Sequence, residues 1–526
     1  MSKLLYQQLW ASADILRGKM DASEYKNYLL GLIFYKYLSD KQLRKVYEIE
    51  SGVVSDYPST DELYSVFKKW YDEDKDNLIL ECKNLLDYFI EPQFLFHYMR
   101  LNEHEFRLND LTQAFVNLSQ ENAQFLGLFD DIDLNSTKLG ITDQQKNICI
   151  ISLIKTLDEI DLFGHEGDVI GDAYEYLISV FASSAGKKGG EFYTPQAVSK
   201  IISKIVSLGH ENKNRFNIYD PTMGSGSLML NIARYITNEN NIYYCGQELN
   251  HTTYNLAKMN FILHGIENSR IRVSNGDTLD ADWPATEPIQ FDGVVMNPPY
   301  SQAWSANDKF LSDSRFEKYG KLAPKSKADY AFLLHGFYHL KDNGTMGIVL
   351  PHGVLFRGAS EGMIRKTLID DGSIDAVIGL PANIFYGTSI PTVVLILKKN
   401  RNNRDVLFID ASKDFEKQKN QNFLTDENID KIVQGYLNRG EIEKYSHLAT
   451  YDEIVKNDYN LNIPRYVDTF EKEEEINIID VSNDIISIDG EIKAIETELL
   501  AMLSDLVSED GSDEIIIATK KVFGNE

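Results

Sequence analysis

The 526-residue chain carries 53 Lys and Arg residues against 80 Asp and Glu, a formal net charge of −27, and 43% of its residues are hydrophobic. A chain of this length and composition can bury sizeable cores in two to four domains. Because it contains no run of 18 apolar residues and its first residues lead into an amphipathic segment, we expect a cytoplasmic protein without a membrane helix or secretion signal.

The first third of the chain is predicted to be helical and the middle to be α/β. Apolar residues recur at helical intervals over 24–38 and 63–71, which predicts a helical N-terminal domain over residues 1–165. From 166 to 415 strand patterns alternate with helical ones, which indicates a doubly wound, mainly parallel sheet of the Rossmann-like kind. Ligands of such sheets bind beyond the carboxyl ends of the strands.

A glycine-rich turn follows the first strand expected in this domain. The strand ends at Asp220, and Gly224 and Gly226 allow the backbone to turn tightly and approach a ligand before a helical pattern over 228–235. Such turns also bind phosphate, but Gly-Lys-Ser/Thr is absent here and in the glycine-rich stretch 186–190. The sequence therefore argues against a P-loop ATPase.

Acidic residues end the next two predicted strands. Glu248 lies 28 residues after Asp220, near the distance at which doubly wound nucleotide folds place a carboxylate on ribose hydroxyls. Asp277 ends the following strand and could accept a hydrogen bond from an adenine amino group. Each acid alone is better explained as a helix cap or turn residue. Three strand-end acids in succession favour a nucleoside-binding site.

The tetrapeptide Asn297-Pro298-Pro299-Tyr300 follows the buried strand pattern 291–296. An exocyclic base amine is a poor nucleophile, and the side-chain oxygen of Asn297 with the Pro298 carbonyl would form a pair of acceptors for its two N–H groups. The prolines fix φ and remove competing donors, while Tyr300 offers a ring on which a base can stack. The alternative is an ordinary proline-rich turn after a strand.

Two further regions have patterns of charged or apolar residues that suggest contacts with DNA or with a partner. Residues 309–327 contain six basic side chains, which fit either one flank of a DNA channel or a solvated loop: Lys309, Arg315, Lys318, Lys321, Lys325 and Lys327. Beyond a polar helical extension over 416–470, residues 471–526 contain a heptad seam formed by Ile485, Ile488, Ile492, Ile495, Leu499, Met502 and Leu506. The seam suits a partner helix or packing on the chain's own domain, and Gly490 could confine the helix to the part after it.

Taken together, these motifs resemble the modification subunits of type I restriction-modification systems, which are N6-adenine DNA methyltransferases. The resemblance runs nearly from end to end, over residues 10–20, 23–26, 171–177, 190–195 and 458–466 as well as the motifs above. It implies an S-adenosylmethionine-dependent enzyme in which Asn297, Pro298, Pro299 and Tyr300 are catalytic. The donor-binding residues implied are Glu191, Phe192, Tyr193, Thr194, Pro195, Gln196, Asp220, Thr222, Gly224, Ser225, Gly226, Ser227, Glu248 and Asp277.

The resemblance also implies partners. A chain with net charge −27 should bind duplex DNA poorly by itself, so we expect a DNA-specificity subunit, a second copy of this chain and an ATP-dependent restriction subunit in the full complex. No metal ligands are apparent, and Cys82, Cys149 and Cys245 lack zinc-site spacing. Two alternatives stay open: methylation of RNA bases or of a protein glutamine, and a scaffold without catalytic activity.

Overall fold

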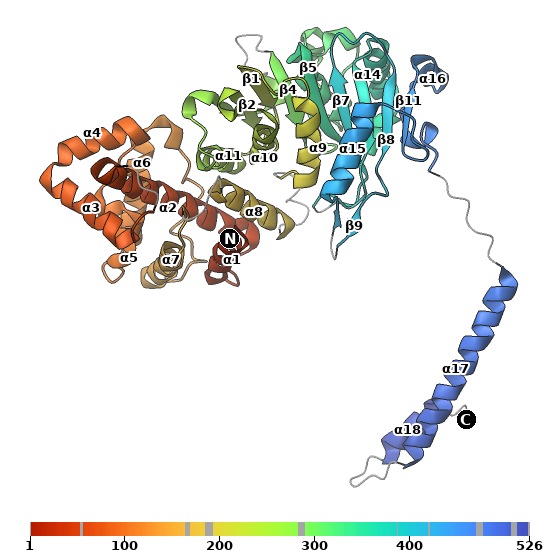
Figure 1. Ribbon diagram of the computed structural model, residues 1–526, viewed down its shortest axis with the longest axis horizontal. Helices are drawn as coiled ribbons and strands as arrows, with labels where there is room; N and C mark the ends of the chain where they lie inside the picture. The colour runs from red at the N-terminus through yellow and green to blue at the C-terminus, as the bar shows by residue number, and fades with distance from the viewer. Residues whose placement is uncertain are drawn as a thin grey trace. The chain divides into compact units, whose positions relative to one another are not determined.

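The computed structural model describes residues 2–52, 56–163, 169–184, 193–281, 290–386, 388–418, 421–469, 477–505 and 513–523. They form two compact units, residues 1–468 and 469–526 (Figure 1). Within the described ranges, no helix combines the length and the apolar character needed to cross a membrane. The four-part domain division expected from the sequence stays a prediction.

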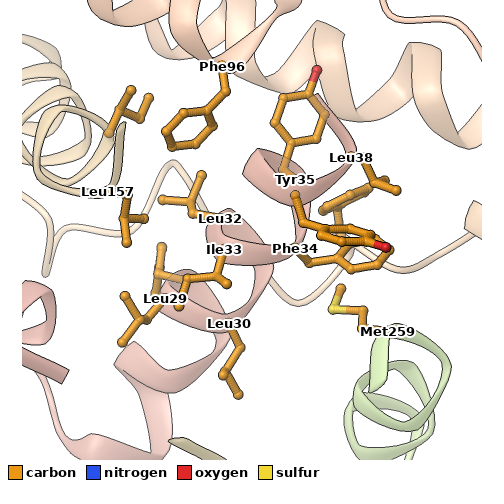
Figure 2. Close-up of a cluster of buried hydrophobic side chains, with 14 of the residues drawn as sticks. Leu29, Leu30, Leu32, Ile33, Phe34, Tyr35, Leu38, Phe96, Leu157 and Met259 are labelled. Carbon is orange, nitrogen blue, oxygen red and sulfur yellow. The ribbon is translucent and has the colours of Figure 1, made fainter. Parts of the chain in front are cut away.

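The N-terminal part is helical, as expected. Its α-helices are α1 (Ser2–Ser12), α2 (Ala22–Ser51), α3 (Thr60–Glu73), α4 (Lys75–Leu86), α5 (Phe96–Leu101), α6 (Leu108–Glu121) and α7 (Asp143–Asp158). Helix α2 begins in a capping box between Asp21 and Glu24 and is buried on nearly all sides between Leu29 and Leu38, as central helices are. Figure 2 shows this core, which extends to Met259 in the α/β part of the chain.

One nine-stranded sheet organises the rest of the first unit, in the order β11-β8-β6-β7-β5-β4-β1-β2-β3. The strands are β1 (Phe216–Asp220), β2 (Ile242–Glu248), β3 (Ile271–Asn275), β4 (Phe291–Met296), β5 (Leu340–Pro351), β6 (Ile374–Gly379), β7 (Thr392–Lys398), β8 (Val406–Asp410) and β11 (Ser446–Ala449). Strand β7 runs antiparallel to β5 and β6, and β11 antiparallel to β8; the other pairings are parallel. A short hairpin, β9 (Glu416–Lys417) with β10 (Asn422–Phe423), forms a second sheet.

Helices cover both faces of the large sheet, which confirms the doubly wound α/β fold. The helices of this part of the chain are α8 (Val169–Ser184), α9 (Gln196–Ser207), α10 (Ser227–Leu230), α11 (His251–Leu263), α12 (Thr278–Ala281), α13 (Asp329–Tyr338), α14 (Ala359–Asp370), α15 (Asp426–Asn438) and α16 (Tyr451–Lys456). Helix α8 packs in the N-terminal core and not on the sheet. Alternate residues of one strand enter different cores: Val294 packs with α13 and α14, and Val295 packs with α9 and α15. Helices α9 and α15 lie side by side, joined by the ion pairs Lys200–Asp426 and Lys204–Asp430 (Figure 1).

Two segments differ from the helices expected. The stretch 228–235 forms only the short α10 and then a 3₁₀ helix (Asn231–Tyr235), and the Ser227 carbonyl accepts from both the main-chain N–H and the side-chain amide of Asn231. After residue 415, where polar helices were expected, strand β11 extends the large sheet.

The second unit consists of α17 (Ile478–Asp505) and α18 (Asp513–Phe523). The helix α17 runs without interruption through Gly490, so the expectation that this glycine confines the helix is wrong: one exposed glycine costs only about 1 kcal/mol, which a helix of 28 residues tolerates. No residue of α17 is buried, and the seam residues Ile485, Ile488, Ile492 and Ile495 are 47–64% exposed. The last seam residue, Leu506, lies outside the described residues.

Candidate active site

The chain turns sharply after β1, at the glycine-rich motif. Asp220 Oδ1 accepts hydrogen bonds from the main-chain N–H of Thr222 at 2.9 Å and from its hydroxyl at 3.3 Å. Gly224 and Gly226 have φ of +55° and +80°, a region that favours glycine, and a Cβ on Gly226 would lie 3.1 Å from the Phe261 ring. Burial raises the pKa of Asp220 to about 8, so a cationic ligand at this turn would stabilise its charged form.

The two acids that follow lie at the ends of β2 and β3. Glu248 Oε2 accepts from the N–H of Gly224 at 3.0 Å, and its Oε1 accepts from the N–H of Asn250 at 2.8 Å. Burial raises the pKa of Glu248, and the backbone hydrogen bonds oppose that rise. Each oxygen keeps lone-pair capacity for a further donor such as a hydroxyl. Asp277 is exposed, and its Oδ1 accepts from the N–H of Leu279 at 2.9 Å, the contact of a turn or helix cap.

The amide of Asn297 is the first side chain beyond β4, and two hydroxyl groups hold it. Its Nδ2 donates to Thr194 Oγ1 at 3.1 Å, and the Tyr300 hydroxyl donates to its Oδ1 at 2.8 Å. The Tyr300 ring meets the ring of Phe385 edge to face, with centroids 5.9 Å apart. The tyrosine that we expected to offer its ring to a base therefore also orients Asn297.

The segment before α9 supplies Thr194 to this arrangement. Two residues predicted here lie outside the described residues, Glu191 and Phe192. Tyr193 is buried beside Tyr386, and Pro195 immediately precedes the first residue of α9. The amide of Gln196 donates to Glu175 Oε2 at 2.8 Å, so it faces α8.

Two cavities meet at Asn297. A cleft of about 750 Å³ is lined by five predicted residues, Thr222, Glu248, Asp277, Asn297 and Pro299. A narrow cavity of about 10 Å³ is lined by Tyr193, Thr194, Asp220, Thr222, Gly224, Ser225, Ser227 and Asn297. The predicted residues that line neither are Pro195, Gln196, Gly226, Pro298 and Tyr300. The turns after β1, β2, β3 and β4 thus converge at one edge of the sheet, as the doubly wound pattern predicted.

Two aromatic side chains near the site were not singled out from the sequence. Phe385, which packs on Tyr300, lies between β6 and β7. Trp304 lines the larger cleft, and its indole N–H donates to the Pro324 carbonyl at 3.1 Å. The only signal for Phe385 was its place between two buried apolar runs, which does not distinguish a site residue from a core residue.

Arg315, one of the six basic residues considered for a DNA channel, is only 2% exposed. Its guanidinium donates to the carbonyl oxygens of Thr278 and Leu279, each at 3.1 Å, and pairs with Asp313 at 2.8 Å. The DNA-flank interpretation is therefore wrong for Arg315, because a buried guanidinium with these partners braces the segment after Asp277.

One group of side chains has the composition of a metal site. Ligand atoms of Asp172, Glu175 and His264 lie within 4.8 Å of one another. Asp172 pairs with Arg234 at 2.7 Å, and His264 Nδ1 lies 2.9 Å from the carbonyl oxygen of Asn260. Burial raises the pKa of Glu175, which favours its neutral form and disfavours a cation ligand role. We assign no metal to this group.

Comparison with known proteins decides the family. Residues 5–157 match the family described as HsdM N-terminal domain, and residues 165–475 match the family described as N-6 DNA Methylase. The chain belongs to the type I restriction-modification methyltransferase subunits. As a member of this family, the protein is a DNA methyltransferase of the N6-adenine type.

Individual relatives span almost the whole chain. The type I restriction enzyme MpnII methylase subunit of Mycoplasma pneumoniae is 35% identical, over 95% of this chain and 96% of its own length. The MjaVIII methylase subunit of Methanocaldococcus jannaschii is 33% identical, over 91% of this chain and 80% of its own. The crystal structure of a type I methyltransferase subunit from Streptococcus thermophilus superposes with a TM-score of 0.87 at 56% identity, covering 89% of this chain and 100% of that one.

Proposed function

We propose that this methyltransferase subunit transfers a methyl group from S-adenosylmethionine to the N6 amine of a flipped adenine in duplex DNA. The observation that carries the proposal is the position of Asn297, which lines both cavities and is held by Thr194 and Tyr300. A methyl donor and an amine acceptor must meet at one point, and this amide lies where the two cavities adjoin.

The donor half of the site suits a nucleoside with a cationic tail. Glu248 would accept hydrogen bonds from the ribose hydroxyls, and Asp277 from the adenine amine. Asp220, whose pKa burial raises to about 8, would be stabilised by a positive charge at the glycine turn. S-adenosylmethionine, when bound, supplies a methyl group already activated by its sulfonium. The protein then needs to contribute alignment and electrostatics alone.

On the acceptor side, Asn297 Oδ1 and the Pro298 carbonyl oxygen would accept hydrogen bonds from the two N–H groups of the adenine amine. The Thr194 hydroxyl holds the amide nitrogen, which fixes the direction in which the oxygen points. Taking the base out of the stack costs a few kcal/mol in general, and stacking of the base on the Tyr300 ring would offset part of that cost.

The test replaces Asn297 by Ala and measures base methylation and donor binding side by side. The chain, reconstituted with its partner, should methylate adenine in duplex DNA, and the variant should lose about 100-fold or more of that rate while binding S-adenosylmethionine with near-normal affinity. Asn343→Ala, an exposed change on β5, is the matched control.

Three other outcomes would each contradict a part of the proposed function. Methylation within about tenfold of wild type, roughly 1.4 kcal/mol in the barrier, would show that Asn297 does not grip the amine. Activity on RNA or on a protein glutamine, without activity on DNA, would show that the methyl acceptor is not an adenine of duplex DNA. A wild-type chain that binds no donor would be a scaffold.

We further propose that a DNA-specificity subunit docks on the seam of α17, with a second copy of this chain and an ATP-dependent restriction subunit completing the complex. The net charge of −27 opposes DNA binding by the chain alone. A row of isoleucine side chains about half exposed to water would be stabilised by packing against a partner protein. Ile488→Asp with Ile495→Asp should abolish assembly, as measured by light scattering.

The matched control is Ile486→Asp, since Ile486 is 69% exposed on the same helix but off the seam. Full assembly by the double variant would defeat the docking proposal and leave the catalytic assignment standing.

A further inference from the structure

The first turns of α2 face the larger cleft of the active site. Ser23, Lys26 and Asn27, spaced at i, i+3 and i+4, lie on one face of the helix, and all three line the cleft. The other residues that line it come from the catalytic domain, between Pro221 and Phe332. The N-terminal helical part therefore forms one wall of the site.

Direct contacts hold this wall in place. The Asn255 side chain on α11 donates to the Gly127 carbonyl at 2.9 Å, and the Thr252 hydroxyl donates to Asp131 at 2.6 Å. Met259 of α11 also belongs to the N-terminal hydrophobic core (Figure 2). Because α11 directly follows the turn that carries Glu248, the position of α2 is fixed relative to the donor half of the site.

Lys26 is the one Lys or Arg among the described residues that line this cleft, where two carboxylates, Glu248 and Asp277, also lie. Burial lowers the pKa of Lys26, and the nearby Asp131 acts in the opposite direction. Asp131 in turn accepts hydrogen bonds from Thr252 and Asn255. A partly desolvated ammonium in a cleft of this size interacts strongly with an anionic ligand that enters it.

The two substrates differ in where they carry negative charge. The adenosine half of the donor, beside Glu248 and Asp277, has no anionic group. The donor carboxylate belongs to the same end of the donor as the sulfonium, which the proposed function places at the glycine turn, and Lys26 does not line the narrow cavity at that turn. A flipped nucleotide, by contrast, brings a phosphodiester on each side of its sugar. The anion available to Lys26 is therefore a phosphate of the DNA strand.

We propose that Lys26 on α2 binds a phosphodiester flanking the flipped nucleotide, so that the N-terminal domain positions the target strand at the active site. The inference rests on the proposed function. It gives a chain of net charge −27 a local cation at the one place where the DNA backbone must approach it.

The test compares Lys26→Gln with Lys26→Arg in the complex of the full chain with its specificity partner. Lys26→Gln should weaken duplex DNA binding several-fold and reduce the slope of log K against log salt by about 0.9, the value for one phosphate contact. Donor affinity should not change. Lys26→Arg, which keeps the charge, should restore most of the DNA affinity and the slope.

Lys258→Gln is the matched control, since Lys258 also lies at the junction, where its Nζ donates to the Leu126 carbonyl at 3.4 Å, but does not line the cleft. An equal loss with Lys258→Gln, or a loss of donor affinity with Lys26→Gln, would overturn the phosphate assignment. So would an unchanged salt slope. If the wild-type complex methylates no DNA, the proposed function fails instead, and the two failures are thereby distinguished.

Discussion

The proposed donor and acceptor halves of the site are held by different kinds of bonds. On the donor side, carboxylates accept hydrogen bonds from the main chain: Glu248 from Gly224 and Asn250, and Asp220 from Thr222. On the acceptor side, Asn297 depends on two side-chain hydroxyls. Main-chain partners cannot rotate away, whereas hydroxyl groups can exchange partners. The donor half is thus built in advance, whereas the acceptor half can change its bonds when substrate enters.

The oxygen of Asn297 illustrates this difference. A side-chain carbonyl oxygen has two lone pairs, and the Tyr300 hydroxyl already uses one of them. An incoming amine must take the second lone pair or displace the tyrosine. The prediction is that changes on the donor side lower donor affinity, while changes to the hydroxyls on the acceptor side alter turnover.

The largest effect on donor affinity is expected from Glu248→Ala. It removes a charged acceptor from the ribose site and releases the N–H of Gly224, so donor affinity should fall about tenfold to a hundredfold, equivalent to roughly 1.5–3 kcal/mol. Calorimetry with S-adenosylmethionine measures this donor affinity in the wild type and the variant. Asp280→Ala, an exposed acid near Asp277 that does not line the cleft, is the control. Unchanged affinity would return Glu248 to a structural role in the turn.

A smaller effect, on turnover alone, is expected from Tyr300→Phe. The change keeps the ring against Phe385 and removes the hydroxyl that orients Asn297, so kcat should change by less than about tenfold, the equivalent of one neutral hydrogen bond. Donor affinity should stay at the wild-type value. Steady-state methylation assays with titration of donor separate the two parameters, and a loss confined to donor affinity would contradict the division between the halves.

The last prediction concerns the stability of the folded chain, through the titration of Asp220. Its pKa is about 8 in the folded protein against about 3.9 for an unfolded chain, so the folded state keeps a proton that the unfolded state releases between these values. The free energy of unfolding therefore falls as pH rises from about 4 to 8. Asp220→Asn should melt close to wild type at pH 5 and a few degrees above it at pH 9. A difference in Tm that does not vary with pH would show that Asp220 titrates normally.

The sequence predicted that Asp220, Glu248, Asp277 and Asn297 would lie close together, because each stands at or just after the end of an expected strand and parallel strands bring such positions to one edge. All four line the cavities at that edge, while the ligand contact assigned to each stays a prediction. The sheet was predictable for the same reason. The alternation of strand and helix patterns fixes its class without any knowledge of side-chain contacts.

What could not be predicted depends on three-dimensional burial. Arg315 lies in a polar, basic stretch, and nothing in that stretch indicates that its guanidinium turns inward to the carbonyls of Thr278 and Leu279. The hydroxyl contact of Tyr300 with Asn297 likewise depends on a side-chain rotamer. Lys26 joins the site only because helix packing brings α2 against α11, and residues more than 200 positions apart leave no local pattern of that contact.

The reversed strand β7 gives the catalytic edge an additional loop. Strand β6 ends and β7 begins at the edge where β4 and β5 also end, since Gly379 pairs with Val393 and Pro351 pairs with Thr392. A parallel connection would have carried the chain across a helix to the opposite edge. A hairpin instead returns Phe385 to the ring of Tyr300. The chain between these two strands thus packs against both halves of the proposed site, through Phe385 on Tyr300 and through Tyr386 on Tyr193.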